Sequence, residues 1–171
     1  TQAKINYNAI ARKILKEIGY SIKFHIIKQI SIQSPDINQA VVKQKLCAND
    51  QGIVYGYATN ETENYMPLPI TIAHALMKEY ENFRYTRKDF FADAKSQVSV
   101  EYENNKPQNI SVVLMSVSHS EKLSRNEIEK LIYENVIKKV LIPYEKIAKN
   151  TKFIVNPSGK FTIWGSFGDS G

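Results

Sequence analysis

Residues 50–62 read Asp-Gln-Gly-Ile-Val-Tyr-Gly-Tyr-Ala-Thr-Asn-Glu-Thr, so that a polar turn, an apolar stretch and a polar connection follow one another. The apolar part, residues 52–58, predicts a strand, because Ile53, Tyr55 and Tyr57 recur at every second position. A further apolar residue lies between them, so this strand would need cover on both faces. It is therefore a candidate subunit interface.

The segment before this stretch predicts a helix, a strand and a long connection. Residues 8–18 carry isoleucine at every fourth position, with Asn8 as a plausible N-cap and Gly19 as a plausible stop. Residues 22–32 alternate in hydrophobicity and predict a strand. Residues 33–50 show no periodicity and predict a long loop, of the kind that often forms a lid or a binding loop.

Two further helices are predicted in the rest of the chain. A helix from Leu68 to Tyr85 has Pro69 in its first turn. Its predicted buried stripe consists of Ile70, Ala73, Met77, Tyr80 and Phe83. The sequence Ser124-Arg-Asn-Glu127 is a capping box, and the helix that it begins should stop before Pro143.

Four short segments complete the predicted sheet. Residues 96–103 and 109–118 predict a hairpin, and residues 153–155 and 161–163 predict a second strand pair. Hairpins that alternate with helices predict an α+β fold of mostly antiparallel sheet with helices on one face. The sequence contains neither GxGxxG nor GxxxxGK[ST], so it does not support a Rossmann or P-loop nucleotide site.

Composition narrows the class of protein. The chain has 171 residues, of which 43% are hydrophobic, enough for the core of one domain or two small ones. It lacks a run of 18 apolar residues, so no membrane span is expected. The single cysteine suits a reducing compartment, and the protein is expected to be cytoplasmic. The three histidines lack the spacing of a zinc site, and no metal site is predicted within the chain.

The net charge of +6 raises the possibility of a nucleic-acid partner. The lysines are spread along the predicted helices, and no run of five basic residues exists. Aromatic residues are not interleaved with clustered arginine and lysine, as they are in proteins that bind single strands. The composition therefore favours solvated helix faces over a nucleic-acid surface.

The polar segment 93–97 is predicted to be a connection between elements, and it carries a possible ligand-binding pair. Asp93 and Lys95 are two residues apart, so in an extended segment both side chains point to the same side. A lysine offers a compact positive charge to a phosphate, and an aspartate can accept from a ribose hydroxyl or an amine. The alternative is a surface ion pair of little energetic weight, and the spacing alone favours it.

Three other positions also allow both a binding role and a structural one. In residues 157–161, Gly159 permits close backbone approach and Phe161 offers a ring to an adenine. The alternative is a hairpin turn with Phe161 in the core, which turn statistics favour. Asp50 could bind an ammonium group or form an Asx turn, and Asp169 has the same two interpretations.

Taken together and in this order, five segments resemble the S-adenosylmethionine synthase (methionine adenosyltransferase) family. Residues 50–62 resemble its DQG-x-x-x-GYAT-x-ET signature, which residues 66–69 continue. Residues 33–39 resemble its QSPDI-x-Q stretch. Residues 93–98 resemble its D-x-K-[ST]-QV motif, and residues 156–161 its NP-[ST]-G-[RK]-F motif.

The resemblance implies an α+β fold built from repeated units of mostly antiparallel sheet covered by helices. It implies the reaction of ATP, methionine and water to S-adenosylmethionine, phosphate and pyrophosphate. The methionine sulfur would attack the ribose 5′ carbon in line, so no protein nucleophile is required. Catalysis would then depend on positioning and on stabilising the charge of the leaving tripolyphosphate.

The resemblance also implies roles for individual residues. Lys95 and Asp169 are expected to be catalytic, with Lys95 on the phosphates. The residues expected to contact ATP are Asp93, Ala94, Lys95, Lys160, Phe161 and Asp169, and Phe161 would stack on the adenine. The residues expected to hold methionine are Gln33, Asp50 and Asp169.

By the same resemblance, residues 1–46 end the family's first segment, residues 47–163 form its middle segment and residues 164–171 begin its last. Mg²⁺ and K⁺ are the expected cofactors, with ligands outside this chain. The expected partners are ATP, methionine and further copies of the chain, in a homodimer or tetramer with its active site at the interface. Nucleic acid and membrane are not expected as partners.

Because the family's flanking motifs are absent, we expect a truncated or divergent chain that is inactive alone. The alternative is a non-catalytic interaction module or a decayed family remnant.

Overall fold

The computed structural model comprises two compact units, residues 1–57 and residues 58–171, and each is described by itself. The residues that the structure describes are 4–20, 23–32, 34–36, 52–165 and 168. The predicted division of the chain at residues 46 and 163 stays a prediction.

The first unit contains helix α1 (Tyr7–Glu17), close to its predicted bounds. The N-cap is Asn6 rather than the predicted Asn8, because the Asn6 Oδ1 accepts the Ala9 N–H at 3.1 Å. At the other end, Gly19 has a φ of 98°, the left-handed conformation in which glycine ends helices. The predicted stop at Gly19 is therefore confirmed.

The two strands predicted on either side of the long loop are wrong for the residues that are described. Neither residues 23–32 nor residues 52–58 form a strand. Ile27, Ile32 and Val54 are 94%, 97% and 93% exposed. Alternation predicts which side chains share a face, but a strand also needs a neighbouring backbone to accept its hydrogen bonds. The predicted loop at 33–50 lies outside the described residues, apart from residues 34–36.

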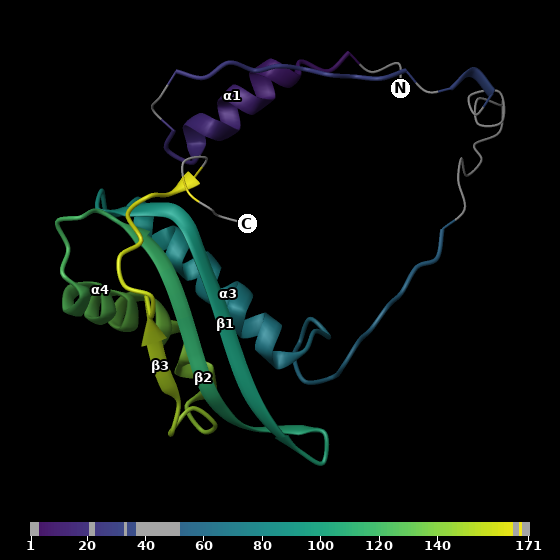
Figure 1. Ribbon diagram of the computed structural model, residues 1–171. Helices are drawn as coiled ribbons and strands as arrows, with labels where there is room; N and C mark the ends of the chain where they lie inside the picture. Colours follow the sequence, from purple (N-terminus) through teal and green to yellow (C-terminus); the bar gives the residue numbers. More distant parts are fainter. Residues whose placement is uncertain (1–3, 21–22, 33, 37–51, 166–167, 169–171) are drawn as a thin grey trace. The chain divides into compact units, whose positions relative to one another are not determined.

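The second unit is built on a three-stranded sheet in the order β1-β2-β3 (Figure 1). β1 (Phe90–Glu103) pairs antiparallel with β2 (Lys106–His119), and β2 pairs parallel with the short β3 (Lys152–Val155). Helices and a mainly antiparallel sheet confirm the predicted α+β class. The predicted pairing of residues 153–155 with 161–163 is wrong, because β3 pairs with β2 after a helical crossover.

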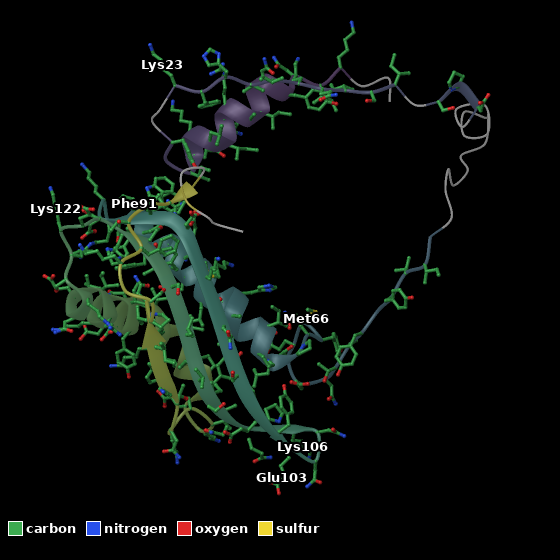
Figure 2. The ribbon with its side chains drawn as sticks, viewed as in Figure 1. Lys23, Met66, Phe91, Glu103, Lys106 and Lys122 are labelled. Atoms are coloured by element: carbon green, nitrogen blue, oxygen red, sulfur yellow. The ribbon has the colours of Figure 1, made fainter. Side chains whose placement is uncertain are left out.

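The long hairpin of β1 and β2 turns at Asn104 and Asn105, with φ values of 48° and 60°. Two consecutive residues with positive φ form the tight turn that matches the twist of a hairpin. Glu103 and Lys106 face each other across this turn, as Figure 2 shows at the tip of the hairpin. The predicted hairpin is confirmed, but its strands are longer than expected. The polar segment 93–97, predicted to be a connection, consequently lies inside β1.

Helix α3 (Leu68–Tyr85) has the predicted bounds and packs against β1. Ala73 and the two aromatic residues of the predicted stripe are buried. Ile70, in contrast, is 37% exposed, and Ile72 and Leu76 are fully buried in its place. The buried stripe is thus rotated from the predicted one.

The last helical segment begins at the predicted capping box. The Ser124 N–H donates to the Glu127 carboxylate at 2.8 Å, and the Glu127 N–H donates to the Ser124 Oγ at 3.4 Å. The segment comprises α4 (Arg125–Ile132), the π-helical turn η1 (Tyr133–Ile137), α5 (Lys138–Leu141) and the 3₁₀ turn η2 (Ile142–Tyr144). The α-helical part ends before Pro143 as predicted.

The helices of the second unit pack on one face of its sheet, as Figure 1 shows for α3 and α4, and the core lies between the two layers. Its fully buried side chains include Ile72, Leu76 and Tyr80 from α3 and Met115 and Val117 from β2. The opposite face of the sheet carries exposed polar residues of β1 such as Lys95 and Gln97. None of the helices in the described part of the chain is long and apolar enough to span a membrane.

Candidate functional site

A hollow of about 250 Å³ lies beside the ends of β2 and β3. Its lining consists of Lys95, Ser116, Asn156, Ser158, Gly159, Lys160 and Phe161. Three residues that the sequence predicts to bind a nucleotide, Lys95, Lys160 and Phe161, therefore meet at one place, although two of them lie 65 or more positions from the third.

Lys95 reaches this hollow because of its place in β1. Its neighbour Ser96 points toward α3 and donates from its Oγ to the Ala73 carbonyl at 3.0 Å. Successive residues of a strand point to opposite faces, so Lys95 points away from the helices, where its β2 partner is Ser116. Lys95 and Lys160 are both exposed, and neither forms an ion pair within the described residues. Two ammonium groups without a carboxylate partner at one hollow are suited to an anionic ligand.

Asn156 controls the path of the chain where β3 ends. Its φ of 44° lies in the left-handed region, and its side chain is 3% exposed. Its N–H donates to the Met115 carbonyl at 2.9 Å. Its Oδ1 accepts the Val117 N–H at 2.8 Å, and its Nδ2 donates to the Val117 carbonyl at 3.0 Å. The side-chain amide thus takes the place of a peptide group beside β2.

Residues 157–160 then leave the sheet, and the chain returns to β2 at Phe161. The Gly159 N–H donates to the Asn156 carbonyl at 3.0 Å and closes a turn. The Phe161 carbonyl accepts the His119 N–H at 2.9 Å. The predicted turn at residues 157–161 is therefore present, but it is a loop out of a parallel ladder rather than a hairpin.

His119 is 3% exposed and bonds to Phe161 a second time through its side chain. The Phe161 N–H donates to His119 Nε2 at 3.2 Å, and His119 Nδ1 lies 3.0 Å from the Ser120 carbonyl. Because a carbonyl can only accept, Nδ1 carries the hydrogen and Nε2 is the acceptor. From the sequence, a lone histidine at a strand end is expected to be a satisfied structural residue rather than a base, so its contact with Phe161 could not be predicted.

Asp93 and Ala94 do not line the hollow. The Asp93 carboxylate accepts a hydrogen bond from the Gly165 N–H, and its carbonyl accepts one from the Ser118 Oγ at 2.7 Å. Ala94 lies opposite Val117 in the register and packs against the core. The other three predicted positions, Gln33, Asp50 and Asp169, lie outside the described residues.

The start of β1, next to Asp93, is held by aromatic contacts and by a buried hydroxyl. Trp164 stacks on Phe91, with ring centroids 5.2 Å apart and an interplanar angle of 12°. Figure 2 shows Phe91 at that end of the sheet. The Tyr80 hydroxyl donates to the Phe91 carbonyl at 2.7 Å, and burial raises the pKa of Tyr80 far above its ordinary value of 10. Burial thus favours the protonated hydroxyl, which is the form that donates.

The described residues do not supply a metal centre. No group of three or more His, Cys, Asp or Glu side chains is close enough, within the described ranges, to hold an ion. Magnesium binding of a polyphosphate needs carboxylate and water oxygens around the ion. The binding of Mg²⁺ and K⁺, whose ligands the resemblance places outside this chain, stays a prediction.

Comparisons with known proteins agree with the motifs. Residues 45–161 match the family described as "S-adenosylmethionine synthetase, central domain". Among curated proteins, the S-adenosylmethionine synthase of Helicobacter pylori (strain HPAG1) is 42% identical over 177 aligned residues. That of Helicobacter acinonychis (strain Sheeba) is also 42% identical over 177 residues. Each alignment covers 95% of this chain and 45% of the relative, so the chain spans about half the length of the curated relatives it matches.

Proposed function

The chain belongs to the S-adenosylmethionine synthase family, and we propose that it is a portion of an enzyme that makes S-adenosylmethionine from ATP and methionine. The observation that carries this proposal beyond family membership is the hollow where Lys95, Lys160 and Phe161 meet. Two cations and an aromatic ring at one hollow are complementary to a nucleoside polyphosphate.

The proposed chemistry needs positioning and charge stabilisation rather than a protein nucleophile. The methionine sulfur attacks the ribose 5′ carbon, a sulfur–carbon bond forms, and the carbon–oxygen bond to the polyphosphate breaks. The leaving tripolyphosphate takes the bonding electrons and is then hydrolysed to phosphate and pyrophosphate. Fixed cations lower the energy of such a transition state, because they offset negative charge where it accumulates.

We assign Lys95 and Lys160 to the phosphate groups and Phe161 to the adenine. Lys95 lies on a strand of the sheet, which holds it more rigidly than a loop would. The expected contacts of Asp93 and Ala94 with ATP would be indirect, since Asp93 is bonded to the Gly165 N–H and Ala94 packs against the core. The proposed roles of Gln33 and Asp50 with methionine, and of Asp169 with both substrates, follow from the motifs alone.

Further groups would have to complete the active site. By the family resemblance, the ligands of Mg²⁺ and K⁺ would lie outside this chain. We propose a homodimer or tetramer, located in the cytoplasm, in which a site at the subunit interface binds ATP and methionine. This chain alone would then bind a nucleotide weakly and turn it over slowly or not at all.

The proposal is tested by equilibrium binding of ATP and of inorganic tripolyphosphate to the purified chain, measured by calorimetry. Lys95→Met and Lys160→Met should each weaken the binding of both ligands by about tenfold, because each removes one charge-assisted contact. Lys106→Met is the matched control, because it removes the same charge at the hairpin tip (Figure 2). Equal weakening by Lys106→Met would show only a general effect of charge. Absence of binding by the unchanged protein would favour the non-catalytic interaction module.

A further inference from the structure

The loop that carries Lys160 and Phe161 is attached to alternate residues of one strand. Met115 and Val117 of β2 bond to Asn156, and His119 bonds to Phe161. Bonds from one edge of a strand to its parallel neighbour normally recur at every second residue. The Asn156 side chain occupies the middle position, so the chain can leave the sheet for residues 157–160 while the ladder of β2 continues.

Both anchors are polar groups in a buried setting. Asn156 and His119 are each 3% exposed, and all their side-chain donors and acceptors named above have partners. A buried polar group without a partner is costly, so each anchor strongly favours the one loop conformation that satisfies it. The backbone of Phe161 is bonded to His119 at both its N–H and its carbonyl.

We infer that His119 and Asn156 are positioning residues, which act through the backbone of this loop to aim Lys160 and Phe161 into the hollow opposite Lys95. The inference rests on the proposed nucleotide site and assigns its two supports. Neither side chain need touch the nucleotide. The two anchors hold the loop in place before the ligand binds, so that the Phe161 ring and the Lys160 amine need not be ordered on binding. Ordering them at that step would weaken the affinity.

The two halves of the His119 side chain can be tested separately. Glutamine at this position can place its carbonyl oxygen where Nε2 lies and accept the Phe161 N–H. Asparagine is too short for that contact, but its amide can still donate to the Ser120 carbonyl, as Nδ1 does. The pair His119→Gln and His119→Asn therefore separates the bond to Phe161 from the rest of the side chain.

The experiment combines nucleotide affinity with hydrogen exchange of the Phe161 amide, both on the full chain. We expect His119→Gln to keep the ATP affinity within about threefold and the Phe161 amide protected. We expect His119→Asn to expose that amide to exchange and to weaken ATP about tenfold, the loss of one buried hydrogen bond. Tripolyphosphate has no adenine, so it should lose less affinity than ATP in the His119→Asn protein.

A second variant tests the other anchor. Asn156→Asp keeps the acceptor for the Val117 N–H, but its carboxylate cannot donate to the Val117 carbonyl. This substitution should therefore also weaken the binding of ATP. Asn150→Asp is the control, because it makes the same change of charge at an exposed residue that does not line the hollow. It should change the ATP affinity by less than either anchor does.

The outcomes separate this inference from the proposed function. If the unchanged chain binds neither ATP nor tripolyphosphate, the proposed function fails. The anchoring is then supported by protection of the Phe161 amide in the unchanged and His119→Gln proteins and its loss in His119→Asn. Rapid exchange of that amide in the unchanged protein would overturn the inference. Equal ATP affinities for His119→Gln and His119→Asn would overturn it too.

Discussion

The carboxylate of Glu61 accepts a hydrogen bond from the hydroxyl of Tyr102 at 2.6 Å, across 41 positions of sequence. It also accepts the Leu68 N–H and the Thr59 hydroxyl, each at 3.0 Å. The Leu68 N–H belongs to the first turn of α3, where backbone donors lack partners within the helix. One side chain of the polar connection thereby joins the start of α3 to the end of β1.

We expect Glu61→Gln to destabilise the protein at neutral pH and to have little effect in acid. The hydrogen bond from Tyr102, and then that from the Leu68 N–H, lower the pKa of Glu61 below its ordinary value of 4.5. A folded-state pKa that is lowered contributes stability above the unfolded value, and this stability is lost as the pH falls through the lowered value. Because Glu61 is partly exposed, the loss should be at most about 1 kcal/mol.

Urea denaturation of the unchanged and the Glu61→Gln proteins at neutral and at acid pH checks this expectation. Glu63→Gln is the control, since Glu63 is an exposed carboxylate in the same connection. A loss for Glu61→Gln that is the same at both pH values would contradict the assigned role of the charge.

Tyr80→Phe should lower the free energy of unfolding by about 1 to 2 kcal/mol, because it removes one donor and leaves a buried carbonyl with one partner fewer. The lost bonds are those from the Tyr80 hydroxyl to the Phe91 carbonyl at 2.7 Å and to the buried Ser118 carbonyl at 3.4 Å. Tyr65→Phe, at a residue 65% exposed, is the control. Burial raises the pKa of Tyr80, so Tyr80 should also stay un-ionised in an alkaline absorbance titration until the protein unfolds. Ionisation of every tyrosine before unfolding would show that Tyr80 is accessible.

Several local signals predicted local structure correctly, although the N-cap of α1 is Asn6 and not the predicted Asn8. The capping box at Ser124 and the stop at Gly19 each depend on residues within a few positions, so sequence alone determines them. The hairpin of β1 and β2 is also local, since its strands are consecutive. Strand ends were harder to predict, because polar residues such as Lys95 occur in a strand whose outer face is open.

Non-local pairings could not be predicted in the same way. β3 pairs with β2 only after the α4–α5 crossover, and short apolar runs do not reveal which neighbour they will find. The role of Asn156 is likewise hidden, because a side chain that replaces a peptide group leaves no periodic pattern. The motifs predicted Lys95, Lys160 and Phe161 as site residues, but not the buried residues that hold them.

The turn between β1 and β2 should be sensitive to β-branched substitution. Asn105→Val should cost about 1 to 2 kcal/mol, because a β-branched residue is strained at the φ of 60° observed here. Asn105→Gly should instead stabilise the hairpin, by a few tenths of a kcal/mol, since glycine adopts this conformation without strain. Gln108→Val, within strand β2, is the control for added branching. Chemical denaturation measures the free energy of unfolding of all three variants. Equal losses for Asn105→Val and Gln108→Val would argue against backbone strain at the turn.

The contact between Asp93 and Gly165 should be visible in the fluorescence of Trp164. The chain has one tryptophan, so its emission reports this segment alone. Asp93→Ala removes the acceptor of the Gly165 N–H, which should loosen the stacking of Trp164 on Phe91 and shift its emission to the red.

Asp93→Asn supplies the matched comparison, because its amide oxygen can still accept that N–H. It should leave the emission and the quenching by acrylamide close to those of the unchanged protein. If the charge rather than the hydrogen bond holds the segment, Asp93→Asn and Asp93→Ala will behave alike. Phe91→Leu removes the ring that Trp164 stacks on, and it should increase quenching even with Asp93 intact, because stacking and hydrogen bonding hold the segment together. An emission spectrum that none of the three substitutions changes would show that Trp164 does not depend on this contact in solution.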